Sequence, residues 1–208
     1  MRTLAIETAS EACSVALFEG ADVLASDHQV LGRGPAESLV PMISALPNKG
    51  KADRILVSLG PGSFTGVRIG LATARALSVA WKAKVVGYPT LRLIAGQAQA
   101  TQPRAVTVCV NAGHGELFMQ NFAASGQSEG ELASLTPDQA RDFPMHDLIA
   151  GNRATQCAAL TEADTVALTV LPDAQYCLGI GPTWLMQDLR PIYGRAPDAT
   201  PQKSQAKA

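Results

Sequence analysis

The stretch ILVSLGPGSFTGVRIGLATARALSVA constrains the fold more than any other part of this chain. The apolar run at 55–59 is followed by a glycine-rich turn and a long helical pattern, which together predict a buried strand leading directly into a helix. Along that helix, Gly66, Gly70, Ala74 and Ser78 recur every four residues. Because side chains four residues apart share a face, this row allows the helix axis to approach its neighbours closely.

The same helix carries a second row of small side chains, formed by Ala72, Ala76 and Ala80. Between the two rows lie Arg68, Arg75 and Lys82 at seven-residue steps, and we expect this charged row to face solvent or a partner. One small row can therefore pack on a sheet while the other meets a second helix. Internal packing of both rows is the plainer interpretation of the same pattern.

The turn before the helix does not match three enzymatic motifs that are rich in glycine. It has no lysine for a phosphate-binding P-loop, no third glycine at the dinucleotide spacing, and no serine framed as a nucleophile elbow. We expect Gly60 and Gly62 to supply unusual backbone angles and Ser63 or Thr65 to cap the helix. An anion bound at this helix start is the alternative to a purely structural turn.

The order of predicted elements divides the chain into two lobes. Residues 1–102 read as βββαβαβα, and the order partly restarts with a hairpin joined by GHG, helices near PDQARDF and NRATQCAALT, a strand at TVALTV and a last helix before Pro191. We place the boundary between Gln102 and Pro103. The prediction is a first lobe at 1–102, a smaller second lobe at 103–194 and a flexible tail at 195–208.

Composition limits the range of partners and locations. Lys plus Arg number 17 and Asp plus Glu 18, so the chain lacks the excess of cations that a broad nucleic-acid interface requires, and any RNA contact is expected to be local or indirect. The four cysteines are scattered and are expected to be buried thiols in a reducing compartment. With no apolar leader and no apolar run long enough for a membrane span, the expected location is cytoplasmic.

Several motifs together resemble the TsaB (YeaZ) family, which acts in tRNA threonylcarbamoyladenosine biosynthesis and is related to TsaD. The resemblance rests on GPGSFTGVRIGLATARALSVA, AIETASEACSVAL, ESLVPMI, NAGHGELF and PIYGRAPDA, and it covers nearly the whole chain. It implies an α/β ASKHA fold (actin-like ATPase, ribonuclease-H-like) with two lobes, each a mixed sheet with flanking helices. The order of elements predicted for the first lobe agrees with that fold.

In folds of this kind, an acidic residue at the end of the first strand and a turn in the other lobe hold nucleotide phosphates. The resemblance places Glu7 and the NAGHG turn at these positions, with Asn111 where relatives often carry an acid. One carboxylate fewer weakens a Mg²⁺ site, so we expect a degenerate nucleotide site with no cofactor and no metal. The run from Pro35 to Glu37 also departs from the His-Ser-Glu of relatives.

The resemblance implies that the transfer chemistry lies in another protein. TsaD uses a pair of histidines along one helix, whereas His28, His114 and His146 of this chain are far apart in sequence. We therefore expect no catalytic residue here. The expected role is a non-catalytic subunit that pairs with and activates TsaD, which transfers threonylcarbamoyl to the adenosine beside the anticodon of tRNAs reading codons that start with A.

By the same resemblance, the partner interface is a bundle built from the first two helices of each protein, here 36–46 and 65–81. The ATPase TsaE is expected to engage the pair, tRNA to contact it indirectly, and the chain alone to form a homodimer. An independent ATP-dependent kinase or carbamoyl transferase of the same fold is the alternative, and a peptidase would need a metal pair or Ser/His dyad that the sequence does not frame. The candidate interface residues are Leu39, Met42, Ile43, Arg68, Leu71, Ala72 and Arg75.

Overall fold

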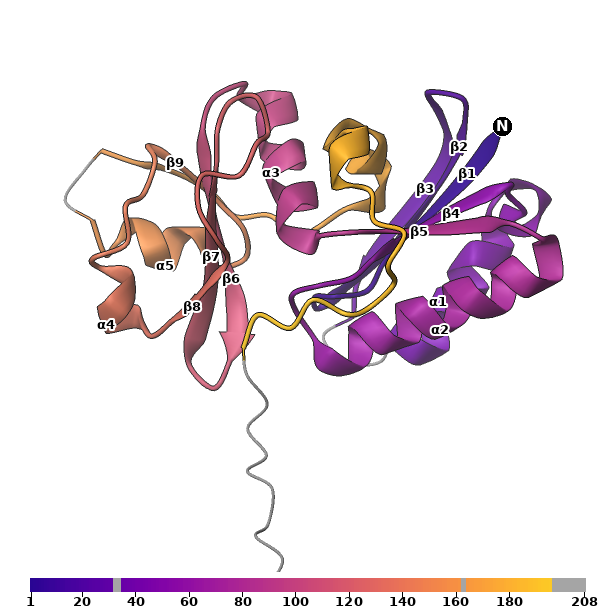
Figure 1. Ribbon diagram of the computed structural model, residues 1–208, viewed down its shortest axis with the longest axis horizontal. Helices are drawn as coiled ribbons and strands as arrows, with labels where there is room; N and C mark the ends of the chain where they lie inside the picture. Colours follow the sequence, from indigo (N-terminus) through magenta and orange to yellow (C-terminus); the bar gives the residue numbers. More distant parts are fainter. Residues whose placement is uncertain (32–34, 162–163, 196–208) are drawn as a thin grey trace, which may run out of the picture.

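The computed structural model describes residues 1–31, 35–161 and 164–195 and has two five-stranded sheets. Figure 1 shows the sheets side by side, each with helices against it, and the chain passing from one lobe to the other and back. This confirms the predicted α/β fold of two lobes with mixed sheets.

The first sheet has the order β3-β2-β1-β4-β5. Three antiparallel strands come first, and β4 and β5 then add in parallel to β1. Parallel addition requires a crossover, which the intervening helices supply. The strands are β1 (Arg2–Glu7), β2 (Ala12–Glu19), β3 (Asp22–Val30), β4 (Arg54–Ser58) and β5 (Lys84–Tyr88).

Two helices, α1 (Pro35–Ala45) and α2 (Phe64–Trp81), cover one face of this sheet (Figure 1). A short 3-10 turn, η1 (Pro47–Gly50), follows α1. The opposite face packs on a 3-10 segment from the end of the chain, η2 (Ala174–Ile180), which is followed by η3 (Pro182–Trp184). Both faces of the sheet are therefore covered, which agrees with the continuous burial of β1, β2 and β4.

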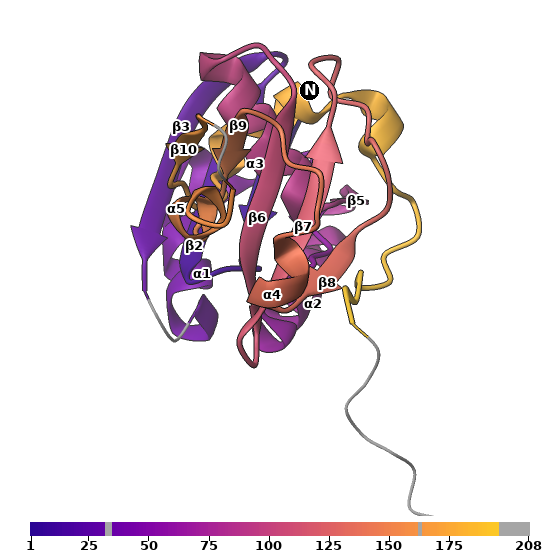
Figure 2. The ribbon, with the colours of Figure 1, turned by 90° about the vertical axis from the view of Figure 1, so that its left-hand side faces the viewer.

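The second sheet has the order β10-β9-β6-β7-β8 and is seen face-on in Figure 2. Helix α3 (Thr90–Thr101) packs against one face through Leu91, Ile94 and Ala98, and two short helices pack on the other. The elements are β6 (Val106–Gly113), β7 (Glu116–Phe122), β8 (Ala133–Leu135), α4 (Pro137–Ala140), β9 (Leu148–Ala150), α5 (Ala154–Ala158) and β10 (Val166–Leu168).

Elements cross the predicted lobe boundary in both directions. Helix α3 lies before that boundary, yet it contributes to the core of the second lobe. The end of the chain lies after it, yet Met186 exchanges backbone hydrogen bonds with Gly87 of β5, and Ile192 donates to the carbonyl of Leu59. The predicted tail lies outside the described residues except for Arg195.

Two sequence-based expectations are wrong in detail. Cys109 on β6 and Cys157 on α5 form a disulfide, so only Cys13 and Cys177 are the buried free thiols that we expected of all four. The helix predicted before Pro191 is instead the pair of 3-10 segments. No helix within the described ranges has both the length and the apolar character needed to cross a bilayer.

Candidate functional site

The glycine-rich turn between β4 and α2 is held by its own polar groups. Ser63 is the N-cap of α2, and its hydroxyl accepts the N–H of Gly66 at 3.1 Å. The N–H of Ser63 donates to the carbonyl of Ala9 at 2.7 Å, which ties the turn to the loop after β1. Two N–H groups at this helix start are therefore already used within the protein, and the bound anion stays a prediction.

The glycines of this turn serve different purposes. Gly60 has a φ of 90°, a conformation that other residues rarely adopt. Gly62 does not have a positive φ, contrary to our expectation. A side chain at Gly62 would instead meet the carbonyl of Ala9, and one at Gly66 would meet the carbonyl of Thr8. Helix α2 can therefore start directly against the end of the first strand only because these two positions lack Cβ atoms.

Glu7 ends β1 and is fully buried. One carboxylate oxygen accepts the N–H of Ala9 at 2.7 Å, and the other lies 3.4 Å from the hydroxyl of Tyr88. Burial raises the pKa of Glu7 to about 7, because the charged form loses its hydration, although hydrogen bonds from Ala9, Ser58 and Tyr88 oppose this rise. The acid that the resemblance assigns to a nucleotide site is thus enclosed behind the cleft wall.

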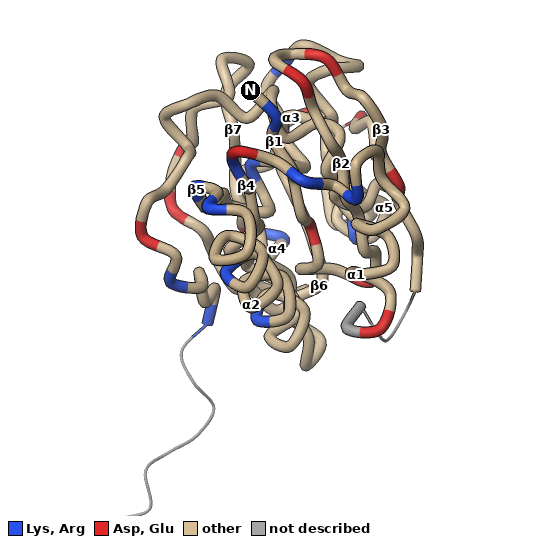
Figure 3. The backbone as a smooth tube through the Cα atoms, turned by 90° about the vertical axis from the view of Figure 1, so that its right-hand side faces the viewer, with Lys and Arg blue, Asp and Glu red and all other residues tan. Residues whose placement is uncertain are grey.

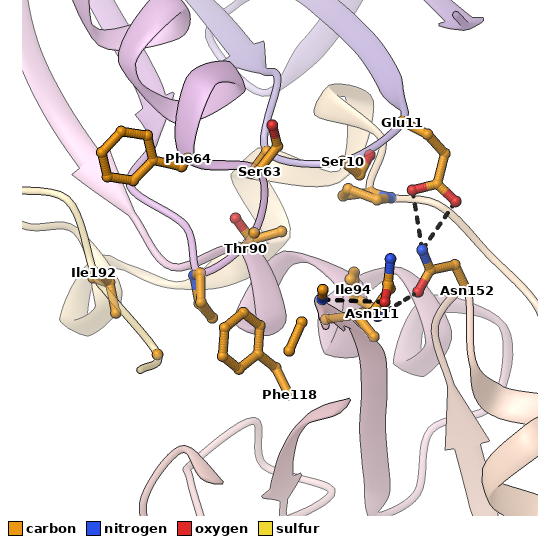
Figure 4. A pocket seen from close by; sticks show the side chains of 18 of the residues that line it. Ser10, Glu11, Ser63, Phe64, Thr90, Ile94, Asn111, Phe118, Asn152 and Ile192 are labelled. Atoms are coloured by element: carbon orange, nitrogen blue, oxygen red, sulfur yellow. Dashed lines mark hydrogen bonds between the residues drawn. The ribbon is translucent and has the colours of Figure 1, made fainter. Parts of the chain in front are cut away.

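A cleft of about 860 Å³ lies between the two lobes. Figure 4 shows side chains from both lobes and from the end of the chain around it. Its wall is mixed, with apolar side chains such as Ile94 and Phe118 and polar groups at the turns. From the first lobe, the lining includes Ser10, Glu11, Ser63, Phe64, Arg68 and Thr90. From the second lobe and the end of the described chain, it includes Asn111, His114, Asn152, Ile192, Tyr193 and Arg195.

Hydrogen bonds bridge the lobes at one side of the cleft (Figure 4). The amide of Asn152, just before α5, donates to both carboxylate oxygens of Glu11, at 2.9 and 3.0 Å. The side-chain oxygen of Asn152 also accepts the N–H of Asn111 at 3.0 Å. Asn111 lines the cleft, whereas Glu7 does not. Sequence reasoning missed Glu11 and Asn152, which are separated by 141 residues.

An aromatic and cationic stack stands at the other side of the cleft. The guanidinium carbon of Arg68 lies 3.1 Å from the ring centroid of Phe64, and its Nη2 donates to the hydroxyl of Tyr193 at 2.6 Å. Phe64 is 62% exposed and Tyr193 is 55% exposed. This stack joins the start of α2 to the last described residues, an arrangement that no local pattern predicts.

The candidate interface residues divide into a buried and an exposed group. Leu39, Met42 and Ile43 on α1 and Leu71 on α2 are buried in the core of the first lobe. A partner could not touch these four side chains in this conformation. The three that lie on the surface are Arg68, Ala72 and Arg75.

The two small-residue rows of α2 have different surroundings. Gly66, Gly70 and Ala74 are buried against the sheet. The second row, Ala72, Ala76 and Ala80, is exposed, and Val79 beside it is 81% exposed. Arg75 on the same face donates to the carbonyl of Leu189 at 3.3 Å. Helix α2 therefore presents a long surface of small and apolar side chains to solvent.

The histidines lie apart from one another. His28 is on β3, His114 is on the turn after β6, and His146 lies before β9, where its ring is 2.7 Å from Glu129. Across residues 1–31, 35–161 and 164–195, no three His, Cys, Asp or Glu side chains are grouped as metal ligands.

Comparison with known proteins identifies the family. The family model described as "TsaD: tRNA N6-adenosine threonylcarbamoyltransferase" matches residues 36–177. The tRNA threonylcarbamoyladenosine biosynthesis protein TsaB of Escherichia coli (strain K12) is 34% identical over 128 residues, which are 59% of this chain and 55% of that protein. The match thus spans about half the length of this curated relative.

Solved structures extend the similarity to nearly the whole chain. YeaZ from Pseudomonas aeruginosa is 27% identical and superposes with a TM-score of 0.79 over 92% of this chain and 99% of that structure. A second structure from the same organism, described as similar to peptidase YEAZ, gives a TM-score of 0.79 at 28% identity, over 93% and 99% of the two chains. The predicted resemblance to TsaB and YeaZ is therefore confirmed, and the chain belongs to the TsaD family.

Proposed function

We propose that this chain is a non-catalytic subunit in the biosynthesis of threonylcarbamoyladenosine in tRNA, and that it works by pairing with and activating a TsaD-type transferase. The similarity to TsaB supports the reaction. The proposed pairing rests on a single observation, the exposed face of α2. The proposed order is pairing first, engagement of the ATPase TsaE next, and threonylcarbamoyl transfer on the partner.

The exposed face of α2 has the chemistry of a helix–helix contact. Its alanines at 72, 76 and 80 allow a second helix to approach at the short end of the usual range of about 8 to 10 Å. Val79, which is 81% exposed, adds apolar surface to this face. Arg68 and Arg75 lie on the same surface and offer donors to carboxylates of a partner.

The cleft supports a non-catalytic role. Glu11 presents a carboxylate to the space between the lobes, where its charge would repel the phosphates of a nucleotide. Asn111 supplies no negative charge for a magnesium ion, and the buried Glu7 does not line the cleft. We expect ATP turnover to depend on the other proteins of the assembly.

Substitution of Ala72 by Trp tests the pairing. Excess volume in a packed contact costs about 1 to 3 kcal/mol, so the dissociation constant for TsaD should rise roughly 5- to 150-fold. Ala100→Trp on α3 is the matched control, because it adds the same side chain to another exposed helical alanine. Equal affinities of both variants, with folding unchanged, would refute the assignment of α2 as the interface.

Reconstituted modification of tRNA tests the role itself. With TsaD, TsaE and the remaining components held constant, product should form only when this chain is added. The same apolar face should drive dimerisation of the chain alone at micromolar concentration, measured by sedimentation velocity, and TsaD should dissociate these dimers. Undiminished product without this chain would contradict an activating role.

An independent ATP-dependent kinase or carbamoyl transferase is the second candidate. The cleft favours it in one respect, since about 860 Å³ is within the range of pockets that hold small ligands. Calorimetry of the isolated chain with Mg²⁺-ATP separates the two proposals. Saturable binding would favour the independent enzyme, and no heat of binding would favour the subunit.

A further inference from the structure

The lysines of the described chain are all at one end of the first lobe. Residues 1–31, 35–161 and 164–195 contain only four, namely Lys49, Lys51, Lys82 and Lys84. Strands β1, β4 and β5 are parallel, so their first residues lie at the same edge of the sheet, and Lys84 is paired there with Arg54. We call these four residues the lysine edge.

Contacts between the segments bring the four lysines together. Lys49 and Lys51, which flank the end of η1, line a surface hollow of about 320 Å³ with Trp81 at the end of α2. Lys82 follows Trp81 directly and is the C-cap of α2. The N–H of Lys84 donates to the carbonyl of Asp53 at 3.0 Å. Figure 3 looks onto this end of the molecule, where blue positions surround the β4 and β5 labels.

Within the described residues, no carboxylate at this end forms an ion pair with the lysine edge. Asp53 accepts the N–H of Arg2 at 2.8 Å, and Glu19 lies 3.7 Å from the side chain of Arg2. Asp22, at the turn between β2 and β3, pairs in the sheet with Glu19. In the part of the chain that is described, none of the four lysines forms an ion pair or a side-chain hydrogen bond, and all four are exposed. Their charges are therefore available to an anionic partner.

We propose that the lysine edge binds the phosphate backbone of RNA, and that in the assembly this RNA is the tRNA substrate. The identity of the RNA rests on the proposed function. A formal net charge of −1 makes the whole chain a poor nucleic-acid binder, but four unpaired lysines on one edge form a local site for several phosphates. Phosphate contacts of this kind position a nucleic acid without reading its bases.

The arrangement favours an extended polyanion over an acidic peptide seated in the hollow. A peptide anchored in the hollow would lie against Lys49 and Lys51, which line it, and would leave the other two lysines unused. Lys82 and Lys84 lie outside the hollow and continue the positive surface along the start of β5. An RNA backbone, with a phosphate at every nucleotide, would engage both pairs.

The test measures binding of an unmodified tRNA transcript to the full chain by fluorescence anisotropy, from 50 to 300 mM salt. Two double variants, Lys49→Gln with Lys51→Gln and Lys82→Gln with Lys84→Gln, each remove half of the edge. Each double variant should lower the magnitude of the slope of log K against log salt concentration by roughly 1.5, and should weaken binding roughly 30-fold at 0.1 M salt. Arg141→Gln with Arg153→Gln, both exposed on the second lobe, is the matched control and should change little.

Each outcome decides the proposal. Losses in both lysine pairs, with thermal midpoints unchanged and the control intact, would support it. Loss only in the Lys49 and Lys51 pair would confine RNA binding to the hollow and overturn the proposed site along the whole edge. No loss in either pair, or an equal loss in the control, would overturn it as well. Because the transcript binds the chain alone, the result stands whether or not pairing with TsaD is found, and TsaD affinity of the same variants reports on the proposed function separately.

Discussion

Glu7 makes the stability of this protein depend on pH in a direction opposite to that of a salt-bridged acid. Its folded-state pKa of about 7 lies above the ordinary value of 4.5, because it is fully buried. Folding therefore favours the protonated form. The stability that this group contributes is fully present below about pH 4.5 and is lost as the pH rises through 7. The total loss is about 3 kcal/mol, most of which falls between pH 5 and 8.

Replacement of Glu7 by Gln should remove this dependence of stability on pH. The amide stays neutral at every pH, and its oxygen can still accept the N–H of Ala9. In urea unfolding at pH 5, 6, 7 and 8, the free energy of unfolding of the wild type should fall by about 2 to 3 kcal/mol more across the series than that of Glu7→Gln. Relative to the wild type, the variant should therefore gain stability as the pH rises from 5 to 8.

A matched control separates this effect from a general loss of one negative charge. Glu131 is exposed, so Glu131→Gln makes the same chemical change without altering a buried group. It should follow the wild type at every pH. If Glu7→Gln also follows the wild type, the carboxyl of Glu7 titrates as in water, and the enclosed site described above does not exist in solution.

Other substitutions and labelling experiments test the remaining features. Gly62→Ala should lower the free energy of unfolding by more than about 2 kcal/mol, because its Cβ would meet the carbonyl of Ala9, whereas Gly179→Ala has open space and should have little effect in the same urea titration. Equal stabilities would contradict the close approach of the turn to β1. Alkylation of the unfolded, unreduced protein should label two thiols by mass spectrometry, those of Cys13 and Cys177, and four labels would show that no disulfide had formed.

The sequence predicted those parts of the fold that depend on local periodicity. The strand at 55–59 and the helix after it, with its two small rows, were readable because buried strands and amphipathic helices repeat at fixed intervals. The three-residue strands β8 and β9 were not predicted, whereas the equally short β10 lies within the apolar run TVALTV that predicted it. The order of predicted elements divided the chain into two lobes, and the resemblance to a known family added the ASKHA architecture of those lobes.

The site was less predictable because its contacts join distant segments. The Cys109–Cys157 disulfide spans 48 residues, and neither cysteine belongs to a motif. The bond between Glu11 and Asn152 likewise depends on how the two lobes meet. The burial of Glu7 could be anticipated only in part, since a strand end next to a glycine-rich turn is compatible with either an open or an enclosed carboxyl.

The last described residues form a wall that two surfaces share. Ile192, Tyr193 and Arg195 line the cleft. The hydroxyl of Tyr193 also accepts a hydrogen bond from Arg68 on the exposed side of α2. A protein that docks on α2 and draws Arg68 toward itself would release the ring of Tyr193 and reshape the cleft behind it. Conversely, a molecule bound between the lobes would change the surface that α2 offers to a partner. The two ligands would then alter each other's affinity by the same factor.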